Sequence, residues 1–363
     1  MLPNPTIRVR FPLAQLPKRS LFQAYHLHAL VGYDTTAAWE WFVRRTYHHA
    51  QFDDPRTLLE AKRARGSVIS VCLPTLNEAE TIVQTIQAIR RPLVEEIPLV
   101  DELVVIDSDS DDDTVQLARA QGATVYQERE ILPELEAFGG KGDALWKSLF
   151  VLEGDILAFI DTDIRNFHPR FAYSLLGPLL LEEGIHYVKG FYERPIQNGG
   201  ELSSTGGGRV TELLARPLLN LFFPALAAVV QPLSGEYAGT REILESLPFF
   251  TGYGVEFGLL VDILDRVGLD ALAQVDMDVK VHRNQGVPEL SRMAFGILQV
   301  AVNRLEALGR IELCTELSNV LYQFKSVDGT YEPEPWLIEV KERPPAITVP
   351  GYRSAGGTRA AGR

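Results

Sequence analysis

Short apolar segments alternate with segments of helical periodicity between residues 67 and 161, and this alternation restricts the fold more than any other feature of the chain. The apolar segments cover residues 68–73, 102–107, 123–127 and 155–161. Between the first two of them, Ile82, Ile86 and Ile89 recur at the spacing of one helix face. Strands that alternate with helices build a parallel sheet that helices cover. The sequence therefore predicts an α/β fold with a Rossmann-like, mostly parallel sheet.

Polar residues follow three of these predicted strands directly. Pro74 stops the first strand, Asp107 and Ser108 end the second, and Asp161 and Asp163 end the fourth. Ligands of such sheets bind at the carboxyl ends of the strands, so these segments are expected to converge. An isolated Asp-x-Asp is more often a solvated turn. At this place, however, its oxygens would suit Mg²⁺ or Mn²⁺ bridging carboxylates and a diphosphate.

Two glycine-rich segments are candidates for binding an anion. Lys141 lies in "GGKGD", which lacks the spacing of a P-loop and is either a flexible turn or a contact to a phosphate. Residues 206–211, "GGGRVT", place three glycines, Arg209 and Thr211 at the start of a helix. Free backbone N–H groups and a guanidinium there would bind a phosphate or carboxylate, although a linker is the simpler interpretation.

Glu256 in "GYGVEFG" and His282 in "VHRN" complete the candidate site. A single histidine is more often structural than catalytic, but this one ends a strand-like segment beside Lys280. We expect His282 to serve as a further metal ligand and Glu256 to orient a sugar or acceptor hydroxyl.

Composition limits the classes of partner. The formal net charge of −13 argues against nucleic-acid binding, which needs a basic face. The two cysteines are too few for a disulfide scaffold, which favours a reducing cytoplasm, and no signal segment is apparent. The longest apolar stretch, residues 218–230, is too short to span a membrane and fits a buried helix or a dimer surface. We therefore expect a cytoplasmic protein, a homodimer, with neither nucleic acid nor membrane as partner.

With these segments assembled, the chain resembles the family of glucosyl-3-phosphoglycerate and mannosyl-3-phosphoglycerate synthases. The likeness covers residues 65–290 and lies in "LPTLNEAETI", "DSDSDDDT", "GKGDALWKSL", "FIDTD", "GGGRVTELLARPLL", "QPLSGEYAGTRE", "GYGVEFGLLVD" and "VHRN". The resemblance implies the A-type glycosyltransferase fold, with a helical subdomain on the acceptor side. It also implies a divalent metal, Mg²⁺ or Mn²⁺, and transfer of a hexose from GDP-mannose or UDP-glucose to the C2 hydroxyl of 3-phosphoglycerate. The product would be a precursor of a glycosylated compatible solute.

The resemblance also assigns residues to the site. It implies that the catalytic residues are Asp163 and Glu256 and that the metal ligands are Asp163 and His282. For the nucleotide sugar it implies Pro74, Leu76, Glu78, Ser108, Lys141, Asp161, Thr162, Asp163, Tyr253 and Lys280. For 3-phosphoglycerate it implies Gly208, Arg209, Thr211 and Asn284.

Two positions depart from the family pattern. Lys280 and Gln285 stand where the glucosyl enzymes are expected to carry arginines, and we expect a permissive donor site in consequence. The expected mechanism retains configuration: the acceptor hydroxyl attacks from the face that the diphosphate leaves, and the diphosphate takes the proton. A covalent Glu256 intermediate is a weaker alternative. A glycosyltransferase with another phosphorylated or lipid-phosphate acceptor and a sugar nucleotidyltransferase remain open.

The chain divides into four segments by pattern. We predict an N-terminal helical arm at residues 1–66, a nucleotide-sugar-binding α/β region at 67–188, an acceptor-binding and helical region at 189–335, and a flexible tail at 336–363.

Overall fold

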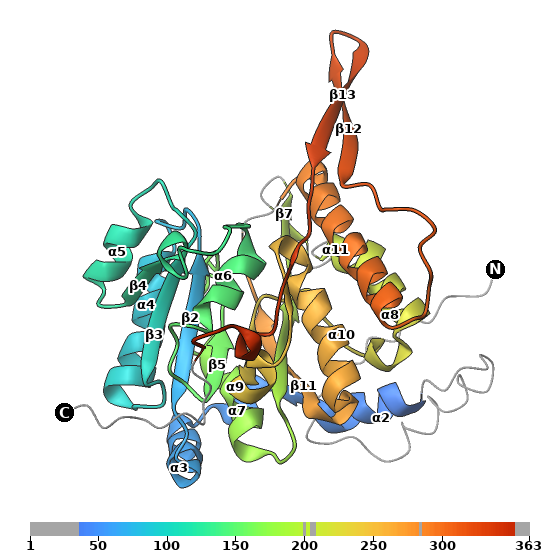
Figure 1. Cartoon of the computed structure of the whole chain (residues 1–363). Coiled ribbons are helices and arrows are strands. Elements are labelled where there is room, and N and C mark those ends of the chain that lie inside the picture. Colours follow the sequence, from blue (N-terminus) through green and yellow to red (C-terminus); the bar gives the residue numbers. More distant parts are fainter. Residues whose placement is uncertain (1–35, 199–200, 204–207, 283–284, 353–363) are drawn as a thin grey trace.

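The computed structural model describes residues 36–198, 201–203, 208–282 and 285–352 of the 363-residue chain (Figure 1). Within this part, one eight-stranded sheet has the order β1-β11-β6-β9-β5-β2-β3-β4. Its pairs are parallel except for those of β9, which runs antiparallel to both β5 and β6. The predicted mostly parallel α/β sheet is therefore confirmed. Its strands are β1 (Thr46–His48), β2 (Ile69–Thr75), β3 (Glu102–Asp107), β4 (Thr124–Gln127), β5 (Ile156–Phe159), β6 (Tyr187–Glu193), β9 (Tyr237–Thr240) and β11 (Leu272–Val279).

Helices cover both faces of this sheet. Successive β2 residues such as Val71 and Cys72 point into two different buried cores, which is why the strand reads as a continuous apolar run. One core packs residues of α3, α4 and α7 against the sheet, and the other packs residues of α6, α8, α10 and α11. The helices are α2 (Thr36–Arg45), α3 (Pro55–Arg65), α4 (Ile82–Arg90), α5 (Thr114–Ala120), α6 (Lys141–Ser148), α7 (Arg170–Leu181), α8 (Arg216–Phe222), α9 (Arg241–Glu245), α10 (Val255–Val267) and α11 (Val287–Ala307).

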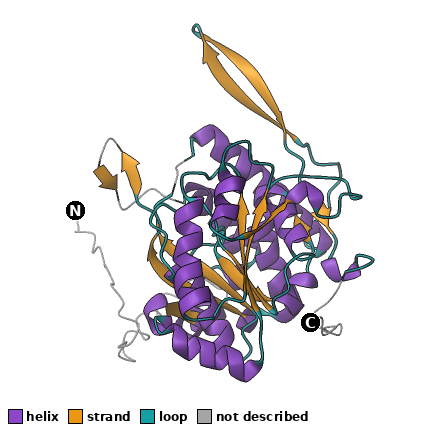
Figure 2. Cartoon of the chain, turned by 90° about the vertical axis from the view of Figure 1, so that its left-hand side faces the viewer, coloured by secondary structure: helices purple, strands orange, loops and turns teal. Residues whose placement is uncertain are grey.

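Two-stranded sheets also occur in the described part of the chain. They pair β7 (Ile196–Asn198) with β8 (Glu201–Ser203), β10 (Phe249–Phe250) with β14 (Glu342–Arg343), and β12 (Val320–Val327) with β13 (Thr330–Leu337). The β12–β13 hairpin projects away from the body, as Figures 1 and 2 show. No helix in the described part of the chain is long and apolar enough to cross a membrane.

The predicted segments are not separate structural units. β1, from the predicted N-terminal arm, pairs with β11, and the boundary at residue 188 falls inside β6. The prediction of a flexible tail from residue 336 is wrong for residues 336–352. In that stretch β14 pairs with β10, Arg343 is 5% exposed and Ala346 is fully buried. Non-local pairing of this kind leaves no signal in local periodicity.

Candidate active site

A cavity of about 550 Å³ opens at the carboxyl ends of β2, β3, β5 and β11. This size lies within the range of roughly 300–1,000 Å³ that is usual for small-molecule sites. The cavity brings together every predicted site residue that the structure describes, whereas Asn284 lies outside the described residues. The predicted residues that line it are Pro74, Leu76, Glu78, Ser108, Lys141, Asp161, Thr162, Asp163, Gly208, Arg209, Thr211, Tyr253, Glu256, Lys280 and His282.

Asp161 lies between two lysines. Nζ of Lys141 is 2.6 Å from Oδ1 of Asp161, and Nζ of Lys280 is 3.3 Å from Oδ2. Burial alone would raise the pKa of Asp161, but the two ammonium groups hold that pKa well below its usual range. Asp161 is therefore ionised, and both of its oxygens are engaged by protein cations.

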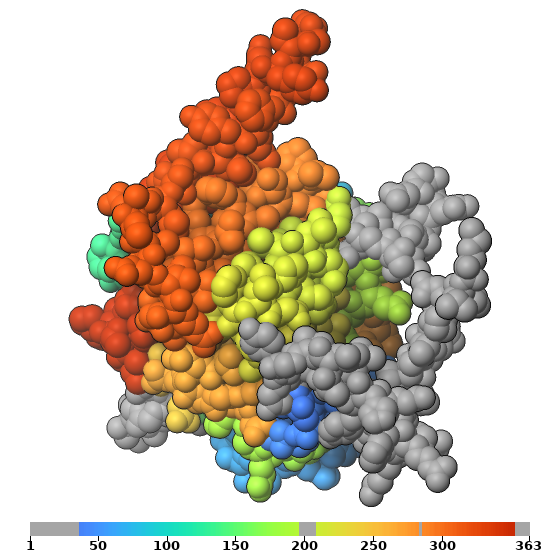
Figure 3. Space-filling view, turned by 90° about the vertical axis from the view of Figure 1, so that its right-hand side faces the viewer, coloured from blue at the N-terminus to red at the C-terminus, as the bar shows by residue number. Residues whose placement is uncertain are grey.

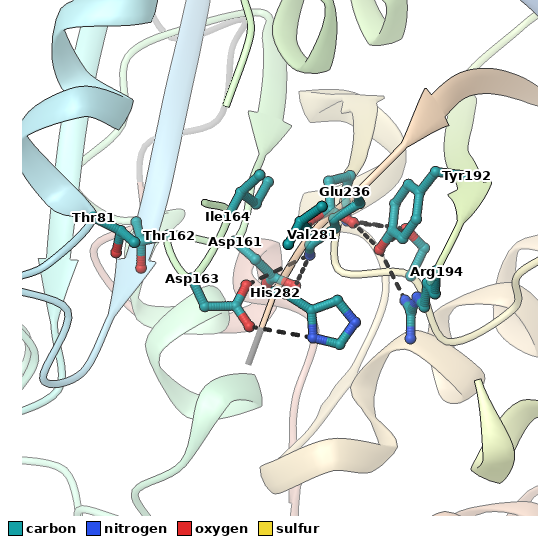
Figure 4. Close-up of polar contacts among 12 residues, drawn as sticks. Thr81, Asp161, Thr162, Asp163, Ile164, Tyr192, Arg194, Glu236, Val281 and His282 are labelled. Atoms are coloured by element: carbon teal, nitrogen blue, oxygen red, sulfur yellow. Dashed lines mark hydrogen bonds and ion pairs between the residues drawn. The ribbon is translucent and has the colours of Figure 1, made fainter. Parts of the chain in front are cut away.

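Asp163 and His282 offer a different environment (Figure 4). Nδ1 of His282 lies 3.9 Å from Oδ2 of Asp163. Oδ1 of Asp163 is buried and accepts no hydrogen bond from the described residues, although Nζ of Lys280 is 3.6 Å away. A buried carboxylate oxygen without a donor, beside an imidazole, fits a divalent cation that takes oxygen and nitrogen ligands. Of the two aspartates, Asp163 is the better placed for a metal.

Lys280 is more deeply buried than the sequence predicts. It is 2% exposed, and its Nζ lies 2.5 Å from Oε1 of Glu236 in addition to its contacts with the two aspartates. Burial opposes its charge, but these carboxylates, Glu236 above all, raise the pKa of Lys280 well above its usual value. Lys280 therefore lies among three carboxylates, whose summed negative charge exceeds its own, and it is not an exposed point charge for a diphosphate.

Glu236 is a site residue that the sequence analysis missed. Its Oε2 accepts hydrogen bonds from the hydroxyls of Tyr192 at 2.6 Å and Ser234 at 2.9 Å, and Arg194 donates to the Tyr192 hydroxyl at 2.8 Å (Figure 4). Because β9 is antiparallel, the residue before its first strand position lies at the same sheet edge as the ends of the parallel strands. A glutamate ahead of an apolar strand was the available signal, but its partner could not be inferred.

Lys189, on β6, is a second residue that the sequence analysis missed. It is 1% exposed, and its Nζ has no hydrogen-bond partner among the described residues. That nitrogen lies 5.0 Å from the centre of the Tyr237 ring. Burial lowers the pKa of Lys189 to about 7, although Glu256 opposes the shift. Because its pKa is close to 7, Lys189 is only partly protonated at neutral pH, whereas Lys141 and Lys280 are protonated.

An ion pair between Lys141 and Glu256 joins two segments that line the cavity. Nζ of Lys141, the first residue of α6, is 2.8 Å from Oε1 of Glu256, in the first turn of α10. Burial would lower the pKa of Lys141, but Asp161 and Glu256 raise it above its usual value. Tyr253, half exposed, lies just before α10.

The predicted anion loop also lines the cavity. Gly208 has φ +75°, a conformation that favours glycine, and Arg209 follows at the helix start. Nη2 of Arg209 donates to the backbone oxygen of Gln285 at 2.7 Å, which turns the guanidinium towards the segment that precedes α11. Thr211 is 5% exposed, and Met293 of α11 adds an apolar wall.

The loops after β2 and β3, where the nucleotide contacts are predicted, form another part of the cavity lining. Leu76 is 54% exposed, so its side chain is available to a ligand. Oγ of Ser108 donates to Glu128 at 2.7 Å, and Oγ1 of Thr162 donates to the carbonyl of Pro74 at 3.3 Å. These bonds fix the loops that carry the predicted nucleotide contacts.

A cluster of His48, His49 and Asp278 lies outside the described lining of the cavity. Nε2 of His48 is 3.1 Å and Nε2 of His49 is 2.6 Å from the Asp278 carboxylate. Nδ1 of His48 accepts the N–H of Ala50, so the proton of the neutral ring lies on Nε2, facing Asp278. The arrangement is therefore an ion-pair and hydrogen-bond cluster that ties β1 to β11, and it is no ready metal site.

Comparisons with known proteins agree with this geometry. Residues 70–192 match the family model described as glycosyl transferase family 2. The chain is 47% identical, over 86% of its length and 96% of the relative, to glucosyl-3-phosphoglycerate synthase of Petrotoga mobilis. It is 50% identical to the enzyme of the same name from Mycobacterium tuberculosis, over 79% of this chain and 87% of the relative.

Solved structures give the same relationship. Mannosyl-3-phosphoglycerate synthase from Rubrobacter xylanophilus superposes with a TM-score of 0.78 at 40% identity, covering 86% of this chain and 98% of that one. Glucosyl-3-phosphoglycerate synthase from Mycobacterium tuberculosis, in complex with Mn²⁺, UDP and phosphoglyceric acid, gives a TM-score of 0.70 at 46% identity, with coverage of 80% and 93%. The chain therefore belongs to the family of glucosyl- and mannosyl-3-phosphoglycerate synthases, which are A-type glycosyltransferases.

Proposed function

We propose that this protein transfers a hexose from a nucleoside diphosphate sugar to the C2 hydroxyl of 3-phosphoglycerate, with a divalent metal, Mg²⁺ or Mn²⁺. The observation that carries the proposal is a single cavity lined by two unlike sets of residues. Asp163 and His282 form one set and the Arg209 loop forms the other, in a chain whose net charge is −13. An acidic protein that places a guanidinium on one wall of its cavity is suited to an anionic acceptor.

The proposed mechanism retains the configuration of the sugar. When bound at Asp163 and His282, the metal offsets negative charge that develops on the departing diphosphate. In this proposal Arg209 orients the acceptor, and Glu256 and Tyr253, which line the same cavity, contact the transferred sugar. The acceptor hydroxyl attacks from the side of the departing diphosphate, which takes its proton. Nζ of Lys141 lies 2.8 Å from Oε1 of Glu256 and holds that side chain in an ion pair, which supports an orienting role over a covalent one.

We expect the donor site to accept both UDP-glucose and GDP-mannose, because the exposed Gln285 lines the cavity where an arginine is expected. A single hydrogen bond to a charged group, made with only one of two donors, changes discrimination by about 1.5–3 kcal/mol, enough to reverse a weak preference. The test measures product formation and kcat/KM with 3-phosphoglycerate and a panel of nucleotide sugars, in the wild type and in Gln285→Arg. The Lys280→Arg change is a poor probe, because a guanidinium would overfill the buried space among three carboxylates.

The possible outcomes of this experiment carry different meanings. Transfer to 3-phosphoglycerate from either sugar supports the proposed reaction, and a shift in donor ratio in Gln285→Arg supports the role of that position. Strict use of one donor, unchanged in the variant, would show that Gln285 does not set the choice. No transfer from any donor would leave a different phosphorylated acceptor as the alternative.

We also propose that the protein is a homodimer formed through the β12–β13 hairpin, the arm that projects in Figure 3. Register places Tyr322, Phe324, Tyr331 and Leu337 on one face of this hairpin, and each of them is at least 60% exposed. An isolated two-stranded hairpin is marginally stable in water, and an exposed apolar face marks an interaction surface. If the hairpins of two copies of the chain pack together, the apolar face of each hairpin covers the apolar face of the other.

For this surface, Phe324→Glu is expected to convert the dimer into a monomer, because it places a charge in the apolar face. Lys325→Gln on the opposite face is the control, because it keeps a polar side chain opposite Glu332 without like-charge repulsion, and it should remain dimeric. Light scattering after size exclusion measures the mass. A monomeric wild type, or equal dissociation of both variants, would remove the hairpin from the interface.

A further inference from the structure

Two loops that carry site residues are packed backbone against backbone. Residues 138–140 precede α6, which begins with Lys141, and residues 251–254 precede α10, which carries Glu256 in its first turn. A Cβ added to Gly140 would lie 3.2 Å from Cα of Gly252, and one added to Gly142 would lie 1.8 Å from the backbone oxygen of Phe250. The ion pair between Lys141 and Glu256 therefore depends on the alignment of these two loops.

The segment that we call the C-terminal strap, residues 338–352, holds the second of these loops. Its strand β14 pairs with β10, so that Arg343 lies opposite Phe249. The N–H of Thr251 donates to the carbonyl of Lys341 at 2.8 Å, and the N–H of Lys341 donates to Oγ1 of Thr251 at 3.0 Å. The strap therefore pairs with the chain up to the start of the loop that leads to Glu256.

Arg343 of the same strap holds the first loop. Its Nε donates to Oδ1 of Asp143 at 2.7 Å, and its Nη2 donates to Oδ2 at 3.2 Å. Oδ2 of Asp143 also accepts the N–H groups of Phe138 at 3.1 Å and Gly139 at 3.2 Å. The guanidinium lies 4.0 Å from the centre of the Phe138 ring and donates to the carbonyl of Glu136 at 2.5 Å. Residues 136–139 are therefore fastened to the strap by the buried bonds of Arg343, and Lys341 adds an exposed contact to Glu136 at 3.4 Å and lies 4.5 Å from the centre of the Phe138 ring.

The bonds made by Arg343 are buried, which makes them costly to lose. Asp143 is fully buried and Arg343 is 5% exposed. Burial opposes the charge of Asp143, yet Arg343 keeps the pKa of that carboxyl below its usual range. Lys147, 3.7 Å from Asp143, is shared with Glu128 at 3.6 Å and gives only partial compensation. Without Arg343 the carboxylate would be left underpaired in the interior, and its two bonds to the loop would weaken.

We infer that Arg343 is a positioning residue that aligns Lys141 with Glu256 for glycosyl transfer, although it lies outside the described lining of the cavity. The inference rests on the proposed function for its catalytic consequence. Its structural part, the joint fastening of two loops by one strap, does not depend on the identity of the substrates.

The test compares Arg343→Gln with Arg241→Gln. Arg241 is a matched control, since it is 3% exposed and bonds the hydroxyl of Tyr352 at the other end of the strap, as well as the carbonyls of Leu149 and Gly154. Steady-state kinetics are measured at a temperature well below the lowest unfolding midpoint among the wild type and the variants. Hydrogen–deuterium exchange is followed at residues 136–143 and 250–254. Arg343→Lys and Asp143→Asn are the additional variants, in case Arg343→Gln does not fold.

In Arg343→Gln, kcat is expected to fall by roughly 10- to 100-fold, the cost of a small misplacement of reacting groups, with KM for 3-phosphoglycerate unchanged. Exchange should rise in both loops, and Arg343→Lys should recover part of the rate. Arg241→Gln should lower the unfolding midpoint without these changes. Equal losses of kcat in both arginine variants, or faster exchange with normal kcat, would overturn the inference.

The outcome also separates this inference from the proposed function. If the wild type transfers no hexose to 3-phosphoglycerate, the proposed function fails, and the exchange measurement alone decides whether Arg343 fastens both loops. Unchanged exchange in Arg343→Gln would then overturn the inference, and faster exchange confined to the two loops would support it.

Discussion

Replacing Asp163 with alanine is expected to lower kcat by roughly 100- to 1,000-fold, because the departing diphosphate would lose the group that offsets its charge. Asp163 has the buried oxygen without a hydrogen-bond donor among the described residues, and His282 lies 3.9 Å from its other oxygen. Titration calorimetry with Mn²⁺ should show weaker binding in Asp163→Ala, and EDTA should abolish turnover of the wild type until metal is returned.

Asp113→Ala is the control for this experiment. Asp113 is an exposed carboxylate before α5 whose side chain makes no capping hydrogen bond, and it lies outside the described lining of the cavity. Its loss should leave metal binding and turnover unchanged. Full activity of the wild type in excess EDTA, or of Asp163→Ala without metal binding, would exclude the metal role.

Replacing Arg209 with alanine is expected to weaken 3-phosphoglycerate binding by about 2–4 kcal/mol, the cost of a lost charge-assisted contact. Binding of the nucleoside diphosphate should barely change, because the predicted nucleotide contacts come from the loops after β2 and β3, whereas Arg209 belongs to a separate loop. Titration calorimetry with each ligand separately measures both quantities. Equal losses for both ligands would show that the loop serves the whole cavity and not the acceptor.

Arg216→Ala is the matched control for Arg209→Ala. Arg216 begins the next helix, α8, and is held by Glu212 and by the carbonyl of Val230, outside the described lining of the cavity. Arg216→Ala removes one positive charge from the same part of the chain as Arg209→Ala does. Affinity for 3-phosphoglycerate should therefore stay close to that of the wild type.

Much of the fold could be predicted because local pattern and tertiary role coincide there. β2 is buried on both faces, so its continuous apolar run indicated a central parallel strand, and Ile82, Ile86 and Ile89 all face one core. The position of Asp161 and Asp163 followed from the rule that parallel strands end at one edge. That rule needs only the order of strands and helices along the chain.

The partners of these charges could not be predicted in the same way. Lys280 binds Glu236 because antiparallel β9 lies between β5 and β6 and brings its first residues to the ligand edge. No periodicity in the sequence encodes a strand direction that depends on neighbours far away in the chain. The burial of Lys280 among three carboxylates could not be anticipated for this reason.

The sequence by itself determined the secondary-structure order, the two-faced burial of the sheet and the residue types at its carboxyl edge, because these depend on local propensity and hydrophobic spacing. Only the tertiary structure decided which cation neutralises which carboxylate, and that the segment around Arg343 fastens the Lys141 and Glu256 loops. Those contacts join residues 119 and 200 positions apart, as in Asp161–Lys280 and Asp143–Arg343. Their energies depend on burial and distance in the folded chain, which local spacing does not contain.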